Sequence, residues 1–276
     1  MTRIALYQSQ TCIDPAANRQ SVVDAIGMAA DGGAEMIFTP EMSNLLDSNR
    51  ERAHASVYRE EDDPLLATAR EAAAALKVWA HLGSLALDAG DDSGRFVNRS
   101  FVIDKDGVIR GRYDKIHLFD VDLPTGESWR ESAAYRGGEM ARVVRDTPVG
   151  TLGLTICYDL RFPALFSALA EAGADVITVP AAFTVPSGQA HWHVLLRARA
   201  VEAGLFVVAA AQGGEHEDGR KTYGHSLVVD PWGTVLLDAE DRNGVHFAEI
   251  DMARISEVRS QIPALSHRKE IGAVAD

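Results

Sequence analysis

The chain has 276 residues, 46% of them hydrophobic, which is enough for one large domain or two small ones with a substantial core. Its 40 acidic side chains outnumber its 27 Lys and Arg residues, and the net charge of −13 argues against nucleic acid or an anionic membrane as a partner. With only two cysteines and no apolar run near the roughly 20 residues of a membrane span, we expect a cytoplasmic protein without disulfides, signal peptide or membrane anchor.

The N-terminal part of the chain begins with the pattern of a β–α–β unit. Short apolar runs predict strands, and apolar residues three and four positions apart predict helices. Asp63 and Pro64 are suited to cap and open the second helix, and the turn at 104–107 predicts a hairpin. In chain order the predicted elements are strand 4–10, helix 18–30, strand 35–39, helix 65–76, and strands 78–85, 99–103 and 108–113.

The rest of the chain contains a second set of strands and helices. Residues 43–62 are polar and predict a loop or a solvated helix face, while 117–138 predict a long ordered loop. The tail, about 261–276, lacks a core pattern, so we expect it to pack in a subunit contact or to remain loose. Since no linker separates two cores, we expect one mixed α/β domain over 1–276. The predicted elements are strands 141–145 and 151–156, a helix from Pro163, strand 175–180, helix 190–203, strands 205–211, 226–229, 235–237 and 245–250, and helix 252–260.

Cys157 lies where a strand pattern gives way to a helix pattern. Leu152, Leu154 and Ile156 alternate with small or polar residues, as in a strand with one buried face, and Pro163 opens a helix. This corner suits a nucleophilic thiol, because a strand end is rigid and the neighbouring N–H groups are free to bind an anion. A buried, inert cysteine is an equally good interpretation of this segment alone.

Glu41 and Lys115 also follow predicted strands. Open α/β sheets gather their active residues at the carboxyl ends of strands. A carboxylate, an ammonium and a thiol at one such edge suffice for acyl transfer, as base, oxyanion binder and nucleophile. Taken singly, Glu41 is also typical of a turn and Lys115 of a solvated surface position.

Three sequence blocks carry a family resemblance. Phe38–Glu41, Arg112–Asp120 and Leu154–Pro163 resemble, in order and spacing, the signature blocks of the nitrilase superfamily of carbon–nitrogen hydrolases. The resemblance runs over nearly the whole chain. It implies an α/β fold of the four-layer α-β-β-α sandwich type and a homodimer or larger homo-oligomer built through helices beside the active site.

Within this superfamily the chain most resembles the Nit branch. The stretch Ala209–His216, with Arg220 and Tyr223–Ser226, is similar to the deaminated-glutathione amidases rather than to the ω-amidases. The resemblance implies an amidase that releases ammonia from a small carboxylate-bearing amide, with deaminated glutathione as the preferred substrate and metabolite repair as its role. The alternatives are an ω-amidase acting on α-ketoglutaramate or succinamate, a nitrilase, and a non-catalytic binding protein with the same fold.

The resemblance also implies a mechanism. Glu41 is expected to act as general base and acid, and Cys157 as the nucleophile that forms a thioester. Lys115 and the backbone N–H of Tyr158 are expected to stabilise the oxyanion, and Glu131 to position the lysine and the substrate. Because an ammonium and a helix start lie nearby, we expect the thiolate of Cys157 to be favoured.

Residues that would bind the substrate are also predicted. Arg161, four positions after the nucleophile, is a candidate partner for a substrate carboxylate, although a salt bridge at the helix start is an equal alternative. Phe183 and Thr184 follow a strand end at which family members contact substrate, and Ser187 is a further candidate. Three further residues are candidates to line the far end of an elongated substrate, although a role in a surface loop is nearly as good an interpretation: His216, Arg220 and Tyr223.

We expect no cofactor and no metal site, because neither Cys-x-x-Cys nor His-Glu-x-x-His occurs in the sequence. His191 and His193 are two positions apart on a predicted helix, so they point to different faces and would not share an ion. His193 departs from the resemblance, because related proteins usually have Glu there, and we expect it to alter a helix contact or the local charge.

Overall fold

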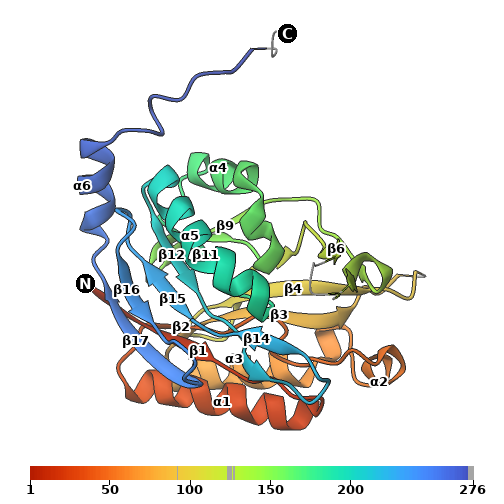
Figure 1. The fold of residues 1–276 in the computed structure, drawn as a ribbon. Coiled ribbons are helices and arrows are strands. Elements are labelled where there is room, and N and C mark those ends of the chain that lie inside the picture. The colour runs from red at the N-terminus through yellow and green to blue at the C-terminus, as the bar shows by residue number, and fades with distance from the viewer. Residues whose placement is uncertain (92, 123–125, 127, 273–276) are drawn as a thin grey trace.

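Two β-sheets lie back to back with helices on both outer faces, which gives four layers (Figure 1). The computed structural model describes residues 1–91, 93–122, 126 and 128–272. One apolar cluster joins the facing sides of the two sheets and the helices on the second sheet, and another lies between the first sheet and its helices. The predicted α-β-β-α sandwich is confirmed.

The first sheet is built from the N-terminal strands and the last strand of the chain. Its members are β1 (Thr2–Gln8), β2 (Met36–Phe38), β3 (Trp79–Asp88), β4 (Phe96–Ile103), β5 (Ile109–Asp114), β8 (Tyr135–Arg136) and β17 (Gly244–Ile250). The order is β17-β1-β2-β3-β4-β5, and β8 pairs with β4. β1, β2 and β3 run parallel, while β17, β4 and β5 pair antiparallel with their neighbours in this order. Along β1, Ile4 and Leu6 face the second sheet and Ala5 faces the helices, as the alternation of a strand requires.

Two helices cover the outer face of the first sheet, α1 (Pro15–Asp31) and α3 (Pro64–Leu76) (Figure 1). Each begins at an aspartate whose carboxylate accepts a free N–H of the first turn: Asp14 from Ala16 at 2.9 Å, and Asp63 from Leu66 at 2.8 Å. The second helix lies where the sequence predicts it, and the first starts three residues earlier than predicted.

The second sheet has the order β16-β15-β12-β11-β10-β9. Its strands are β9 (Arg142–Thr147), β10 (Gly150–Leu154), β11 (Val176–Thr178), β12 (Phe206–Ala209), β15 (Leu227–Val229) and β16 (Val235–Asp238). β10, β11 and β12 are parallel, as are the three central strands of the first sheet. The helices α4 (Pro163–Glu171) and α5 (Val185–Ala203) cover the outer face, and α6 (Ala253–Gln261) lies beyond β16 and β17 (Figure 1).

The structure corrects the sequence prediction in several segments. The predicted loop at 117–138 contains the hairpin of β6 (Asp120–Asp122) and β7 (Ser128–Arg130), and a 3₁₀ turn at Glu131–Ala133; residues 123–125 and 127 lie outside the described part. Helix α5 starts at Val185 rather than near 190, because Pro186 is well placed in a first helical turn. The short helix α2 (Arg50–His54) lies in the polar segment 43–62, for which a loop or a solvated helix face was predicted; β13 (Gly213–Glu215) and β14 (Lys221–Tyr223) were not predicted.

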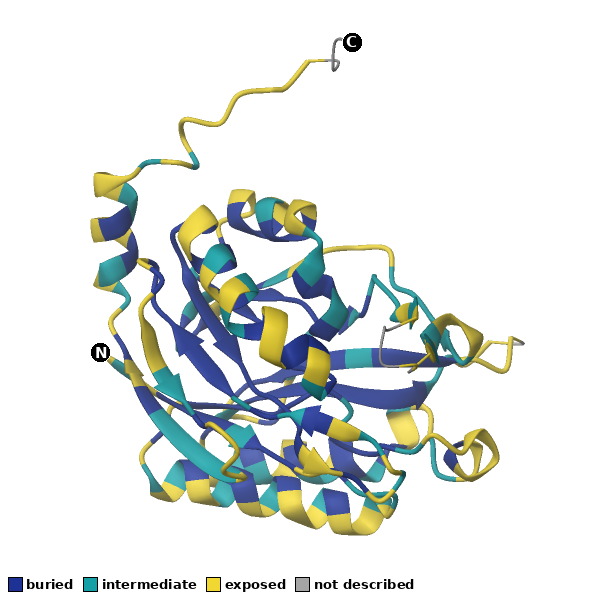
Figure 2. Ribbon diagram, in the orientation of Figure 1, coloured by how far each residue is buried: buried dark blue, intermediate teal, exposed yellow. Residues whose placement is uncertain are grey.

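Buried residues concentrate in the strands and on the sides of the helices that face them (Figure 2). The tail leaves α6 and reaches α4, where the guanidinium of Arg268 lies 2.5 Å from the carboxylate of Glu171. None of the helices in the described ranges is both long and apolar enough to cross a membrane.

Candidate active site

The carboxyl ends of three strands bring Glu41, Lys115 and Cys157 to one edge of the sandwich. Glu41 follows β2, which is a parallel strand of the first sheet. Cys157 follows β10, which is a parallel strand of the second sheet. Lys115 comes directly after β5, which points the same way as β3 because the chain reverses direction twice between them. The predicted meeting of these strand ends is therefore present in the structure, and it draws on both sheets.

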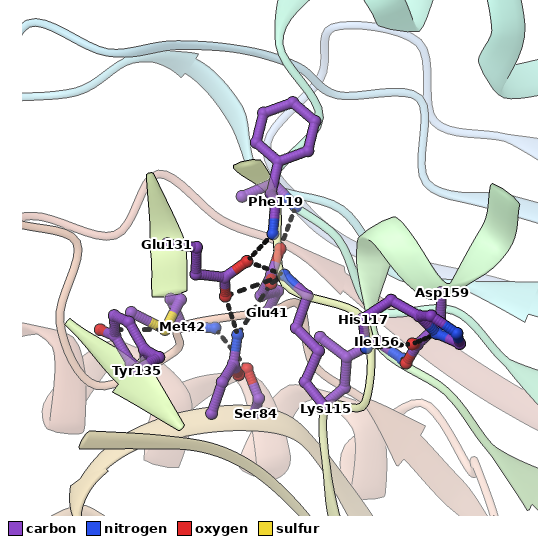
Figure 3. A network of polar contacts seen from close by, with 12 residues as sticks. Glu41, Met42, Ser84, Lys115, His117, Phe119, Glu131, Tyr135, Ile156 and Asp159 are labelled. Carbon is purple, nitrogen blue, oxygen red and sulfur yellow. Dashed lines mark hydrogen bonds and ion pairs between the residues drawn. The ribbon is translucent and has the colours of Figure 1, made fainter. Parts of the chain in front are cut away.

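Lys115 lies between two glutamates (Figure 3). Its Nζ donates to Oε1 of Glu41 at 2.9 Å and to Oε1 and Oε2 of Glu131 at 3.0 and 2.9 Å. The lysine side chain is 3% exposed, and the carboxylate side chains are 5% and 14% exposed. An ammonium buried this deeply is stable only when it is paired, and the two carboxylates both keep it charged and hold it in place.

Each glutamate is fixed by further donors. Glu41 accepts from Nδ2 of Asn98 and from the backbone N–H of Ala182, each at 2.9 Å. Glu131 accepts from the backbone N–H of Phe119 at 2.6 Å. Asn98 was not predicted, because it lies near the start of β4 (its third residue) and not at the carboxyl end of a strand, where active residues are expected.

In this cluster the carboxylates and the ammonium stabilise one another's charged forms. Burial raises the pKa of the Glu41 carboxyl, but the Lys115 ammonium and the hydrogen bonds to Glu41 outweigh burial, so its pKa lies below the usual value. Burial lowers the pKa of Lys115, but the charges of Glu131 and Glu41 outweigh this effect and raise it well above the usual value. Glu41 is therefore ionised and Lys115 protonated at neutral pH.

Cys157 occupies a strained corner between β10 and a 3₁₀ turn at Cys157–Arg161. Its φ of 50° is in the left-handed region that non-glycine residues rarely adopt, and the residue is 8% exposed. Burial, followed by the charge of Glu41, raises the pKa of the thiol well above its usual value, and Lys115 offsets only part of this. The expectation of a favoured thiolate is therefore wrong, because the nearest carboxylate and the loss of water outweigh the ammonium.

The backbone around Cys157 is held by Asp159, which is fully buried. Its carboxylate accepts the backbone N–H of Ile156 at 2.9 Å, the hydroxyl of Tyr113 at 2.7 Å and the backbone N–H of His117 at 3.1 Å. The Cys157 N–H donates to the Pro180 carbonyl at 2.8 Å and the Asp159 N–H to the Ile156 carbonyl at 3.1 Å. Between them, the N–H of Tyr158 has no acceptor within the described ranges.

These groups open into a cavity of about 350 Å³. Of the predicted substrate-binding residues, Phe183, Thr184 and Ser187 line it, and so does Arg220 on the loop between β13 and β14. The guanidinium of Arg220 lies 4.9 Å from the ring centre of Trp129, which also lines the cavity. The side-chain nitrogens Nε of Arg220 and Nε1 of Trp129 are buried without a hydrogen-bond partner among the described residues, whereas Nη2 of Arg220 lies 3.2 Å from the carboxylate of Asp218.

Three other predicted residues do not line the cavity. Arg161 lies behind Phe183, with its guanidinium 5.6 Å from that ring centre and 3.2 Å from Nδ1 of His191. His216 is buried, with its ring nitrogens 2.9 Å from the Thr11 carbonyl and 2.7 Å from the Thr222 hydroxyl. Tyr223 stacks on the ring of His225 instead.

His193, which replaces the glutamate usual in related proteins, contacts the second sheet. Its Nε2 lies 2.9 Å from a carboxylate oxygen of Asp238, so a helix residue pairs with the end of β16. His191 points to Arg161 instead, which agrees with the expectation that the two histidines use different faces of the helix.

A family model described as carbon-nitrogen hydrolase matches residues 3–260. The chain belongs to the carbon–nitrogen hydrolase family. The resemblance to the nitrilase superfamily and its Nit branch is thereby confirmed, and with it the expectation of a hydrolase acting on amides.

Curated and solved relatives of this hydrolase agree with the assignment. A protein of Yersinia enterocolitica named deaminated glutathione amidase is 40% identical over 245 residues, which are 88% of this chain and 85% of that protein. The crystal structure of the NitFhit protein of C. elegans matches with a TM-score of 0.91 and 39% identity, over 97% of this chain and 65% of that one.

A third relative bears on the cysteine. A variant of the amidase from Nesterenkonia sp. AN1 matches with a TM-score of 0.80 and 26% identity, over 97% of this chain and 94% of that chain. That structure is described as showing covalent addition of the acetamide moiety of fluoroacetamide at the active-site cysteine. In the present hydrolase Cys157 is the buried cysteine, whereas Cys12 is partly exposed and donates to Asn18.

Proposed function

We propose that this carbon–nitrogen hydrolase cleaves a small carboxylate-bearing amide to an acid and ammonia through a thioester on Cys157. The observation that carries the proposal is the pairing of Lys115 with both Glu41 and Glu131 in the cavity that Cys157 also lines. A protonated thiol beside an ionised carboxylate is a nucleophile with its base already in place.

The first half-reaction forms the thioester. Sγ of Cys157 attacks the amide carbon while its proton passes to Glu41. The oxyanion accepts hydrogen bonds from Nζ of Lys115 and the N–H of Tyr158. When the carbon–nitrogen bond breaks, the leaving nitrogen takes the proton from Glu41 and departs as ammonia. Glu131 holds Lys115 in position through both of its oxygens.

The second half-reaction returns the enzyme to its starting state. Glu41 takes a proton from water, and the hydroxide attacks the thioester carbonyl. The carbon–sulfur bond breaks, the acid leaves, and the sulfur recovers its proton from Glu41. One carboxylate serves both steps because it alternates between its ionised and protonated forms.

The preferred substrate is deaminated glutathione, in a metabolite-repair role. Relatives of 37–40% identity from a bacterium, a cyanobacterium, a social amoeba and a mammal carry the name deaminated glutathione amidase, which supports this choice. The cavity supports it too, because Arg220 lines it and a guanidinium is well suited to bind the carboxylate end of an elongated amide.

We further propose that residues 1–276 form one catalytic domain that works as a cytoplasmic homodimer. Val194 and Val201 on α5 are 59% and 53% exposed, and Ile262 at the start of the tail is 56% exposed. Apolar side chains exposed on neighbouring elements favour contact with a second copy. Analytical ultracentrifugation tests the assembly, and a monomer at micromolar concentration would contradict it.

The test of the activity is ammonia release from an amide panel, with intact-mass analysis of the protein for the acyl adduct. We expect the highest kcat/KM on deaminated glutathione, less on α-ketoglutaramate and succinamate, and none on nitriles. The Cys157→Ala variant should fold normally and release no ammonia. Full activity of that variant, or no ammonia and no adduct with any amide, would sink the proposal; the latter would favour a binding protein.

A further inference from the structure

A cluster of three side chains outside the cavity joins three separate segments. His193 lies on α5, His225 follows β14, and Asp238 ends β16. Nε2 of His193 lies 2.9 Å from Oδ2 of Asp238, and Nδ1 of His225 lies 2.9 Å from Oδ1. One potential metal-ligand atom can be chosen from each residue so that the three atoms all lie within 4.8 Å of one another. None of the three lines the cavity that holds Cys157.

We propose that His193, His225 and Asp238 form a binding site for one divalent transition-metal ion, with Zn²⁺ as the best-matched ion. Two imidazole nitrogens and one carboxylate oxygen are donors that zinc prefers, and hard cations such as Mg²⁺ prefer all-oxygen sites. A four-coordinate zinc keeps its donors roughly 3.3 Å apart, so small side-chain rotations bring these three atoms to that spacing. The proposal does not depend on the amidase assignment.

The ligands are held by their surroundings. The Asp238 carboxylate accepts the backbone N–H of Glu240 at 2.8 Å. His225 has a φ of 56°, its carbonyl accepts Nε1 of Trp192 at 2.8 Å, and its ring stacks on Tyr223 with centroids 4.3 Å apart. Groups behind the ligands that fix their orientation strengthen metal binding.

The site is also accessible. The three side chains are 36%, 24% and 27% exposed, so an ion can enter and water can complete its coordination. A bound ion would tie α5 to β16 and to the segment after β14. Because the first turn of α5 carries Ser187 of the cavity wall, the ion would stabilise a helix on which the cavity depends.

The same short distances also suit a simple hydrogen-bonded cluster of two imidazoles around one carboxylate. Zinc titration distinguishes the two arrangements. The parent for this experiment is the full chain with Cys157→Ala and Cys12→Ser, which removes both thiols as competing ligands. The protein is stripped with a chelator, then titrated with ZnCl₂ in a calorimeter, and its Tm is recorded at each zinc concentration.

We expect one Zn²⁺ per chain and a Tm that rises with zinc concentration, whereas MgCl₂ should change nothing. His193→Gln and Asp238→Asn should lose both effects while keeping the circular dichroism spectrum of the parent. His191→Gln, on the same helix but facing Arg161, should retain both. No saturable zinc binding by the parent, or equal binding by the parent and both variants, would overturn the metal site and leave a hydrogen-bonded cluster.

Discussion

At the scale of single residues, the site is governed by the charges that surround Cys157. The thiol is protonated because burial and the neighbouring Glu41 carboxylate both disfavour the thiolate. Glu41 therefore has two opposite effects: it makes the resting sulfur less ionised, and it is the group that removes the proton during attack. These effects can be separated by removing the charge of Glu41 while keeping its shape.

Glu41→Gln should abolish hydrolysis yet make Cys157 easier to ionise. With the carboxylate gone, its repulsion of the thiolate is lost while the ammonium of Lys115 stays in place, so the pKa of the thiol falls. In a Cys12→Ser background, the rate of alkylation by iodoacetamide should reach its half-maximal value about 1–2 pH units lower in the variant. An alkylation profile that stays in place or moves to higher pH would contradict this electrostatic account.

Arg220→Ala should weaken the binding of substrates that carry a distant carboxylate. Loss of a charge-assisted hydrogen bond costs about 1.5–3 kcal/mol, which is roughly a ten- to hundredfold loss in kcat/KM, mainly through KM. Lys221→Ala is the matched control, because the neighbouring lysine is exposed and pairs with Glu215 at 2.9 Å. If both variants have the parent's KM on deaminated glutathione, Arg220 does not contact the substrate.

The sequence predicts the reactive residues better than the residues that hold them in position. Glu41, Lys115 and Cys157 follow strand patterns, and strand ends converge for reasons that hold in any α/β sheet. Asn98 and Asp159 carry no such signal, because their contacts arise only when β4 and β5 come next to the Cys157 corner. Arg161 was predicted as a substrate-binding residue but does not line the cavity. Its spacing from Cys157 suggested proximity, but Phe183 lies between its guanidinium and the cavity.

At the scale of elements, the Cys157 corner depends on the tie between the second sheet and β5. Asp159 makes this tie, through Tyr113 at the end of β5 and through His117, whose Nδ1 lies 2.6 Å from its carboxylate. The left-handed backbone of Cys157 persists only if its neighbours hold it there. The conformation of the Cys157 corner therefore depends on contacts from both sheets.

Asp159→Ala should destabilise the protein by about 3–5 kcal/mol, because several buried donors lose their acceptor at once. Tyr113→Phe removes only one of these hydrogen bonds and should cost about 1–2 kcal/mol. Urea unfolding measures both, and kcat should fall more in Asp159→Ala than in Tyr113→Phe. Equal effects of the two variants would show that Asp159 does not organise the corner.

The long elements were predictable and the short ones were not. The apolar spacing of α1 and α3 extends over several turns, and the Asp63 cap of α3 is visible in the sequence, whereas Asp14, the cap of α1, predicts only a turn. β13 and β14 have three residues each and form a two-stranded sheet of their own, so they are too short to show the alternation that marks a longer strand. Their hairpin nevertheless carries Arg220, which is why the far end of the cavity was hardest to predict.

At the scale of the whole molecule, the two sheets meet very closely near the site. A Cβ at Gly83 would lie 2.0 Å from the carbonyl oxygen of Thr39 and 2.5 Å from Cβ of Pro180. Glycine at this position of β3 therefore lets the strand ends that carry Glu41 and Ala182 approach one another. His81, two residues earlier, is buried in the same region, with Nε2 2.9 Å from the Ser100 hydroxyl and 3.4 Å from that of Thr178.

Burial lowers the pKa of His81 from 6.5 to about 3, which makes stability depend on pH. Between these values the unfolded chain binds a proton that the folded protein does not, so this contribution is complete above about pH 6.5 and is lost as the pH falls towards 3. Its upper limit is roughly 5 kcal/mol. His81→Gln should unfold with a flatter dependence on pH over this range, whereas His267→Gln, in the exposed tail, should keep the parent's slope. Identical slopes for the parent and His81→Gln would contradict this contribution.

The cluster around Lys115 has a consequence for the length of acceptable substrates. Two carboxylates and one ammonium leave an excess of one negative charge among side chains that are largely buried. A substrate whose own carboxylate is adjacent to the amide carbon would bring like charge against it, where little solvent screens the repulsion. A longer acid places the same charge towards Arg220 and escapes this penalty. The enzyme should therefore discriminate among substrates by the number of bonds between the amide carbon and the carboxylate. Substrates with the shortest separation should be excluded before the thiol can reach the amide.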